Sequence, residues 1–368
     1  MNLLILSSST GGGHNMRASA LKYWWEKNGG SAKISHPLEN SFQLYKLGSN
    51  FYNFVQKYYP AFHNVYFHFL EFACLHSKKS KILGARSWLK DVSLFDPKIV
   101  VSVHAHLNHG YIDLLKEHIY ERLKVVIYCG ELADGVGFSR HWINPNADLF
   151  LGPFKETCKA AKDRGMPIKK TLEVGPLLRP AFYQSTDESI KLQIFNKYKI
   201  HPDCPIILLG TGANGVNRHH EVLLSLRNLN TNFQVIALCG SNRKTFSKIQ
   251  VMKEKLKFNV IPLLTVNDQE MALFLREAKF LFARPGAGTT TEAVVCGTPM
   301  IFDLSRGVMP QEINNLNFWK SRNSKIIKTN KPKNVRHYIA EDIPSIKIEI
   351  DSTPKRLLNS LEMLSLRL

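Results

Sequence analysis

The chain has 368 residues, 44% of them hydrophobic, which is the size and composition of a globular protein with about two domains. No apolar stretch approaches the ~20 residues of a membrane-spanning helix. Basic residues exceed acidic ones, and the net charge of +19 favours an anionic partner such as acidic lipid head groups or a phosphorylated substrate. Nucleic acid is the weaker option, because no zinc-finger spacing, RNP-type motif or basic helix with heptads is present. Six cysteines without C-x-x-C spacing argue against a disulfide framework and fit a reducing cytosol.

Apolar runs alternate with amphipathic stretches along the amino half, where the first run is expected to be a buried strand. Strands are expected at residues 3–7, 98–103, 125–129 and 149–152, and helices at 15–27, 109–123 and 155–164. The carboxyl half repeats the pattern, with strands expected at 205–209, 233–238, 259–262 and 280–283 and helices at 219–226, 244–256 and 268–278. This alternation predicts an α/β protein with two Rossmann-like, doubly wound parallel-sheet domains facing each other across a cleft.

Two stretches depart from this alternation. Residues 42–72 are dense in Phe and Tyr within a Lys-rich surrounding. Two alternatives remain open for them: a buried helix pair, or an interfacial element with aromatics at the acyl boundary and lysines at anionic head groups. In the tail, Pro354 precedes a stripe of leucines, which predicts a packed terminal helix.

The most informative stretch is residues 283–319. After an apolar run come Pro285, Gly286, Ala287 and Gly288, and then three threonines that lead into Glu292. Glycines let backbone N–H groups approach an anion, and the start of the following helix adds its positive dipole end. Glu292, one turn into that helix, suits sugar hydroxyls, and a second polar pair, Gln311 and Glu312, follows. A loop for a diphosphate and polar groups for two sugars predict a nucleotide-sugar site.

A second glycine loop follows the first strand and ends in His14 at the mouth of a helix. An imidazole is the side chain most readily tuned to accept a proton near neutral pH. Because ligands of doubly wound sheets bind at the carboxyl ends of strands, the two glycine loops are expected to face each other.

Two further motifs give only weak indications of a binding site. Residues 210–215 match G-x-G-x-x-G, but the next expected strand ends without the acid that would hold a dinucleotide ribose. His104, His106 and His109 have zinc-like spacing, but only Asp113 is near to complete a set of ligands, so cleft lining or structural packing is favoured.

Together these residues resemble the two-domain GT-B glycosyltransferases, in the branch of plant-type monogalactosyldiacylglycerol synthases and bacterial processive diacylglycerol glucosyltransferases. The peptidoglycan lipid-intermediate N-acetylglucosaminyltransferase is a more distant relative. The matching pieces, in the family's order, are GGGHNMRASA, VGPLLRPAF, CGSNRK, RPGAGTTTEAVVCGTPMI and PQEINN.

The resemblance implies a UDP-sugar donor, an inverting transfer that needs no metal or other cofactor, and a lipid acceptor. It assigns residues 1–182 to the acceptor and membrane side and residues 183–368 to the donor. The diphosphate would be held by Gly286, Gly288, Thr289 and Thr290, the ribose by Glu292, and the sugar hydroxyls by Gln311 and Glu312. Other donor-side residues are Gly12, Gly13, Gly212, Asn214 and Ser241. Residues 42–72 coincide with the family's membrane-touching acceptor region.

Some residues depart from the family pattern. No Asp precedes the first glycines, and Glu131 stands where Thr-Asp is usual. In the H-x-x-W-x-H-like segment, Trp142 matches, but Ser139 and Asn144 occupy the histidine positions, with His141 as a near substitute. The expected catalytic residues are therefore His14, Glu131 and His141.

The sequence thus predicts a cytoplasmic, peripheral membrane enzyme that transfers a hexose from a UDP-sugar to a lipid such as diacylglycerol, without nucleic acid as a partner. The alternatives are a glycosyltransferase with a soluble or polysaccharide-intermediate acceptor, and a UDP-sugar-binding protein or epimerase without transferase activity.

Overall fold

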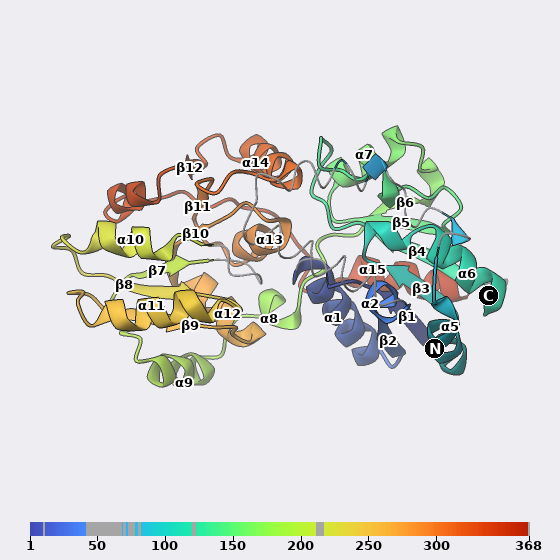
Figure 1. Ribbon diagram of the computed structural model, residues 1–368, viewed down its shortest axis with the longest axis horizontal. Helices are drawn as coiled ribbons and strands as arrows, with labels where there is room; N and C mark the ends of the chain where they lie inside the picture. The colour runs from blue at the N-terminus through green and yellow to red at the C-terminus, as the bar shows by residue number, and fades with distance from the viewer. Residues whose placement is uncertain are drawn as a thin grey trace. The chain divides into compact units, whose positions relative to one another are not determined.

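The computed structural model describes residues 1–9, 12–41, 68, 71–72, 78–79, 82–119, 123–210 and 217–366. The chain forms two compact units, which we consider separately (Figure 1). The first unit consists of Met1–Pro180, Met309–Asn314 and Ile350–Leu368. The second consists of Ala181–Val308 and Asn315–Glu349, and the short helix α8 (Pro180–Tyr183) contains the point where the chain passes into it.

The first unit is built on a parallel sheet whose strands follow the order β2-β1-β3-β4-β5-β6. The strands are β1 (Asn2–Leu6), β2 (Ser31–Ser35), β3 (Ile99–Ser102), β4 (Lys124–Tyr128), β5 (Leu149–Gly152) and β6 (Thr171–Glu173). Because β2 and β3 pair with opposite edges of β1, the winding direction reverses between β1 and β3. Such a switch point leaves a crevice at the carboxyl ends of the strands.

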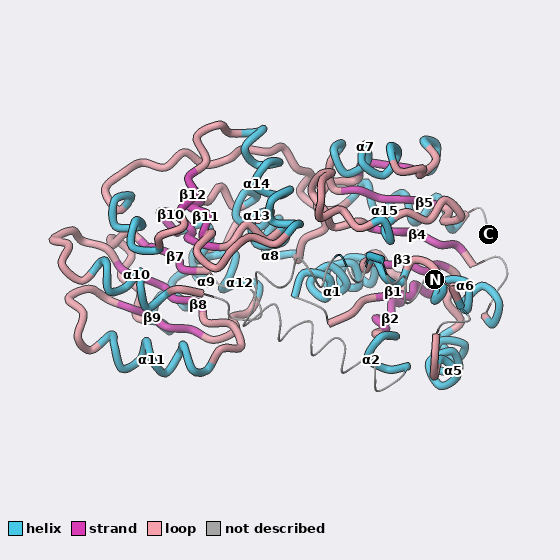
Figure 2. Tube along the Cα trace, turned by 45° about the horizontal axis from the view of Figure 1, so that its top comes forward, coloured by secondary structure: helices cyan, strands magenta, loops and turns pink. Residues whose placement is uncertain are grey.

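Helices cover this sheet and complete its core (Figure 2). They are α1 (Gly12–Lys27), α2 (Pro37–Ser41), α5 (Ala85–Phe95), α6 (Gly110–His118), α7 (Lys155–Asp163) and α15 (Lys355–Ser365), with single 3₁₀ turns η3 (Ala105–Leu107), η4 (Arg140–Trp142) and η5 (Ile168–Lys170). The core contains Trp88, Tyr111, Trp142 and Phe150. The central strands are buried on both faces, which explains their continuous apolar sequences.

The second unit repeats the architecture, with strand order β12-β11-β10-β7-β8-β9. The strands are β7 (Ile206–Leu209), β8 (Gln234–Leu238), β9 (Val260–Leu263), β10 (Ala278–Ala283), β11 (Met300–Asp303) and β12 (Ile327–Thr329). The helices are α9 (Glu188–Tyr198), α10 (His219–Leu226), α11 (Arg243–Lys253), α12 (Asp268–Glu277), α13 (Ala287–Val295) and α14 (Pro310–Arg322), with the 3₁₀ helix η6 (Pro332–Tyr338). Here β8 and β10 flank β7, so the switch point lies between β7 and β10.

The α/β fold class with two doubly wound parallel sheets is confirmed. Four short strands were not predicted, namely β2, β6, β11 and β12; three of these lie at the sheet edges, where partial exposure weakens the apolar signal. The first helix begins at Gly12 rather than residue 15, so Gly12, Gly13 and His14 form its first turn.

The two units differ from the predicted division at residue 182. The tail helix α15, expected in the second domain, belongs to the first unit, as do Met309–Asn314 at the start of α14. Leu357 and Leu361 of α15 are buried. Chain order placed this helix in the wrong domain because an apolar stripe shows that a helix packs, and not which core it joins.

Candidate functional site

The polar residues of the first unit gather at its switch point. Adjacent strands β1, β3 and β4 end at Leu6, Ser102 and Tyr128, and the segments that follow them carry His14, His104 and Glu131. Since parallel strands present their carboxyl ends at one edge, residues far apart in sequence meet there.

His14 bridges the two strands that flank the switch point. Its Nδ1 lies 2.7 Å from the carbonyl oxygen of Val103, the residue after β3. A carbonyl only accepts hydrogen bonds, so Nδ1 carries the proton and Nε2 is left as the acceptor. Burial lowers the pKa of His14 to about 4, and the positive charge of Arg17 adds to this effect. His14 is therefore neutral at physiological pH and its Nε2 can accept a proton.

Four further imidazoles continue from His14 as a row of ring contacts. Ring centroids are 4.5 Å apart between His14 and His104, and 5.7 Å between His104 and His106. His141 follows at 4.8 Å from His106, and His109 at 6.2 Å from His141. The pKa of His109 is lowered by burial and by neighbouring His141. His14 and His141 thus belong to one cluster without contacting each other directly. Among the described residues no group of His, Cys, Asp or Glu has the arrangement of a metal site.

Glu131 lies beside the same cluster and is held by two neighbours. The indole N–H of Trp142 donates to its carboxylate, and burial raises the pKa of Glu131, with the Arg17 charge acting in the opposite direction. Arg17 also donates from Nη2 to the Gly130 carbonyl oxygen at 2.8 Å. A Cβ at Gly130 would collide with this guanidinium, so the glycine permits the contact. Sequence reasoning missed Arg17, although it lies three residues after His14 on the same helix.

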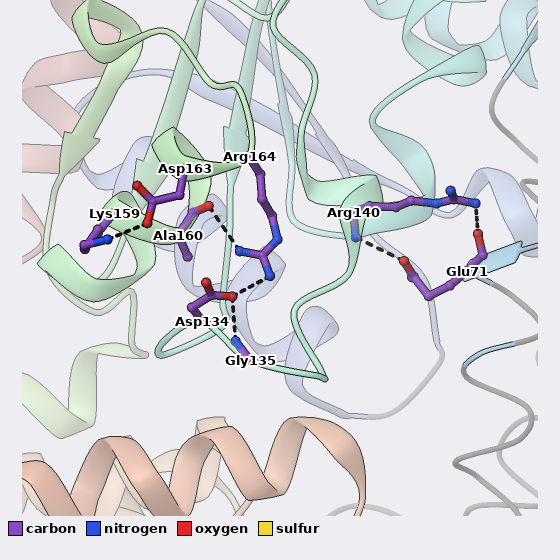
Figure 3. A network of polar contacts seen from close by, with 8 residues as sticks. All are labelled: Glu71, Asp134, Gly135, Arg140, Lys159, Ala160, Asp163 and Arg164. Carbon is purple, nitrogen blue, oxygen red and sulfur yellow. Dashed lines mark hydrogen bonds and ion pairs between the residues drawn. The ribbon is translucent and has the colours of Figure 1, made fainter.

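The segment that carries Glu131 and His141 is fixed from both ends (Figure 3). Arg164 forms an ion pair with Asp134 at 2.5 Å, and Asp134 accepts from the Gly135 amide at 2.6 Å. At the other end the Glu71 carboxylate accepts from the Ser139 hydroxyl and, at 3.1 Å, from the Arg140 amide. These contacts hold the turn η4, and hence His141 and Trp142, against the sheet.

The expected histidine positions hold structural residues instead. Ser139 caps η4 by accepting from the His141 amide, and the Asn144 amide group donates to the Asn108 carbonyl oxygen at 2.5 Å. Asn108 in turn donates to the His141 carbonyl oxygen at 3.1 Å and is fully buried. Asn108 was not predicted, and a lone Asn in a loop gives no sequence signal for such a role.

In the second unit, a short loop after β10 leads directly into helix α13. Helix α13 starts at Ala287, with Gly286 as its N-cap. A Cβ at Gly286 would meet no atom within 4 Å, so the backbone there faces open space. The first amides of a helix have no intrahelical acceptor, and they carry its positive dipole end. The amides of Ala287, Gly288 and Thr289 lie at this helix start, beside the switch point, and amides so placed suit an anion.

Thr290 differs from its neighbour Thr289. Its hydroxyl donates to the Gly286 carbonyl oxygen at 2.8 Å and accepts from the indole N–H of Trp319 on α14 at 2.9 Å. Asn315 of α14 donates to the Pro285 carbonyl oxygen at 2.8 Å. Thr290 thus holds the loop to α14, while Thr289 is only partly buried.

The other predicted donor residues have varied surroundings. Glu292 is buried in α13, with 4% of its surface exposed. Glu312 accepts from the Met309 amide at 2.9 Å and so caps α14, and Gln311 stands beside it at the start of that helix. Ser241 is exposed just before α11. Gly212 and Asn214 lie outside the described residues.

His219, the first residue of α10 and four residues after the G-x-G-x-x-G match at residues 210–215, was also missed. It is 1% exposed, and its Nε2 donates to the Leu238 carbonyl oxygen at 2.6 Å. Burial lowers its pKa to about 4. Its position shortly after the glycine-rich motif at residues 210–215 was the sequence signal that could have pointed to it.

The comparisons with known proteins agree with this architecture. Residues 207–341 match the model of the glycosyltransferase family 28 C-terminal domain. A probable monogalactosyldiacylglycerol synthase 2 of Oryza sativa subsp. indica is 24% identical over 86% of this chain and 68% of its own length. Among solved structures, Acinetobacter baumannii MurG has a TM-score of 0.52 at 14% identity, covering 100% of this chain and 93% of its own.

Another solved structure with this fold is the UDP-GlcNAc 2-epimerase of Neisseria meningitidis. It has a TM-score of 0.58 at 12% identity and covers 100% of both chains. Likeness at this identity shows the fold, while the family model and the synthases specify the enzyme class. The two doubly wound units and these matches identify the chain as a glycosyltransferase of the GT-B type, similar to the monogalactosyldiacylglycerol synthases.

Proposed function

We propose that this glycosyltransferase moves a hexose from a UDP-sugar to a lipid acceptor such as diacylglycerol, with inversion at C1 and without a metal or other cofactor. The observation that carries the proposal is the start of α13 at the switch point of the second sheet, where the first helix amides have no intrahelical acceptor and a Cβ at Gly286 would meet no atom within 4 Å. Support for the lipid comes from the monogalactosyldiacylglycerol synthases, which match 86% of the chain.

On the donor side, the amides of Ala287, Gly288 and Thr289 would hold the diphosphate, and Glu292 the ribose. Gln311 and Glu312 would contact the hexose, and Gly12 and Gly13 in the first turn of α1 are the donor-side residues proposed in the first unit. As UDP leaves, negative charge grows on its phosphate oxygens. Fixed helix amides stabilise that charge without reorganising, which is the work a metal would otherwise do.

On the acceptor side, His14 would accept the proton of the attacking hydroxyl at Nε2. The acceptor oxygen bonds to C1 as the bond from C1 to the diphosphate breaks, so one displacement inverts the configuration. A negative charge nearby raises an imidazole pKa, so a bound anionic donor would strengthen this base. Glu131 and His141 would hold the acceptor through the polar cluster around Trp142.

A location on an anionic membrane surface, on its cytoplasmic side, is also proposed. It depends on the basic and aromatic residues 42–72, which lie outside the described residues except for His68, Glu71 and Phe72. Within the described part of the chain, no helix has the length and apolar character needed to cross a bilayer.

The test is a donor screen that measures UDP release from common UDP-hexoses, with and without diacylglycerol vesicles. We expect release to depend on one hexose and on the lipid, with labelled sugar recovered in the lipid phase. Turnover with soluble acceptors only would replace the lipid proposal, and sugar isomerisation without transfer would indicate an epimerase. Flotation with anionic vesicles checks membrane binding separately.

A further inference from the structure

A basic groove runs along α10 in the second unit. It has a volume of about 900 Å³ and is lined from two segments, residues 218–229 and 330–337. The second segment contains η6, which packs against α10. None of the lining residues belongs to the anion loop 284–290, to α13 or to α14, so the proposed donor function does not use this groove.

Positive charge dominates the lining. Arg218, at the start of α10, is neutralised by Glu221 at 2.6 Å, and Glu221 is the one acidic residue in the lining. Four further cations line the groove, and within the described part of the chain none of them has a carboxylate partner: Arg227, Lys331, Lys333 and Arg336. The side chains of all four are exposed, and the Nε of Arg336 donates to the neighbouring His337 at 3.5 Å.

This charge pattern differs from that of an ordinary solvated helix face. On such a face, basic and acidic residues usually alternate and pair at short spacing. Here four cations from two distant segments line one concave surface, and like charges that share a surface repel one another. An anion held between them would relieve this repulsion, and concave walls strengthen the field it meets.

The groove also offers an apolar contact. Leu224 of α10 is 42% exposed and lines it, together with Leu229 and the buried Pro332. A ligand with carbon next to its phosphate would cover Leu224, whereas a bare ion would leave it in water. Guanidinium groups such as those of Arg227 and Arg336 bind phosphate oxygens in a two-pronged geometry.

We propose that the groove between α10 and η6 is a second anion site, distinct from the donor site, that binds phosphate-bearing ligands through Arg227, Lys331, Lys333 and Arg336. The phosphate can come from lipid head groups at a membrane surface or from a soluble phosphate compound. Either source would give the second unit a phosphate contact independent of sugar transfer.

The experiment measures binding to the full chain with saturating UDP present, which blocks the donor site. One arm titrates inorganic tripolyphosphate by calorimetry, and the other measures flotation with phosphatidylcholine vesicles, with and without phosphatidylserine. The groove variant combines Arg227→Gln, Lys333→Gln and Arg336→Gln. The control removes the same charge at exposed sites outside the groove, through Lys255→Gln, Lys257→Gln and Lys325→Gln.

We expect the groove variant to lose about tenfold or more in affinity in at least one arm, and the control to lose much less, because contact with phosphate and not net charge governs binding. Loss in the vesicle arm alone identifies a lipid surface, and loss in the tripolyphosphate arm alone identifies a soluble phosphate. Equal losses in the two variants, or unchanged binding in the groove variant, would overturn the proposal.

Two further readouts keep this result separate from the donor site. UDP affinity should be unchanged in the groove variant; a matching loss of UDP binding would show that the groove is part of the donor site and overturn its separate role. Each single substitution is measured beside the triple variant, with thermal melting as the folding check. A failure of the transferase proposal would not affect these binding data, since neither arm requires turnover.

Discussion

His14 and His219 are imidazoles that the fold keeps neutral, one in each unit, and His219 is the more fully buried of the two. Each bonds to a carbonyl oxygen near a strand end, His14 to Val103 and His219 to Leu238, and burial lowers each pKa to about 4. The same physical state serves two purposes. In His14 it leaves a nitrogen able to accept a proton, whereas in His219 it ties α10 to β8.

His219 predicts a pH dependence of stability. Because its pKa is lower in the folded protein than in the unfolded chain, the unfolded state binds more protons between about pH 6.5 and 4. The contribution of His219 to the free energy of unfolding is complete above about pH 6.5. It falls by about 1.4 kcal/mol per pH unit below that. His219→Gln keeps a donor for Leu238, so its free energy of unfolding should fall less steeply over this window in urea titrations. An unchanged slope would contradict the assignment.

The pKa of His14 predicts how the activity declines at acid pH. His14→Ala should lower kcat by about a hundredfold or more, since a positioned base contributes on this order. UDP affinity should persist in this variant. With a pKa of about 4, wild-type kcat/KM should hold down to about pH 5 and decline below it. His118→Ala, at an exposed imidazole on α6, is the control and should keep full activity. A wild-type limb centred near pH 6.5 would show that another group titrates.

At the scale of elements, the link between α13 and α14 orients the anion loop. Trp319 of α14 donates to Thr290, and Asn315 donates to Pro285, so two contacts from one helix fix the start of the other. Three consecutive threonines precede Glu292, and the sequence alone does not distinguish their roles. In the structure the Thr290 hydroxyl supports the loop, whereas Thr289 is only partly buried and is proposed to contact the ligand.

Substitutions at Thr289 and Thr290 test whether these two residues have different roles. Thr290→Val removes the hydroxyl that accepts from the buried Trp319 N–H and should lower the free energy of unfolding by about 1–3 kcal/mol. Thr289→Val should change it by less than about 0.5 kcal/mol yet weaken UDP binding. Urea unfolding and calorimetric titration of UDP measure the two effects. The reverse pattern would exchange the two roles.

At the scale of the whole molecule, the chain's last helix returns to the first unit. Leu361 of α15 is fully buried, and Met363 on the same helix is 59% exposed. Leu361→Ala should lower the free energy of unfolding by about 2–5 kcal/mol. This loss of stability should appear as faster hydrogen exchange in β1, β3 and β4, with exchange in β7, β8 and β10 unchanged. Met363→Ala should leave exchange in both sheets unchanged. Faster exchange in the second sheet would contradict the assignment of α15.

The sequence by itself determined the two doubly wound units and the glycine-rich start of α13, where an anion site is predicted. Buried parallel strands must be continuous apolar runs, and a close approach of backbone to phosphate needs glycine, so both leave local patterns. Only the tertiary structure decided the placement of α15, the roles of Arg17 and Asn108, and the different surroundings of Thr289 and Thr290. It also decided the convergence of the basic groove from residues 218–229 and 330–337. These features depend on which distant segments of the chain meet. The order of the strands in the sheets determines those contacts, and local periodicity does not.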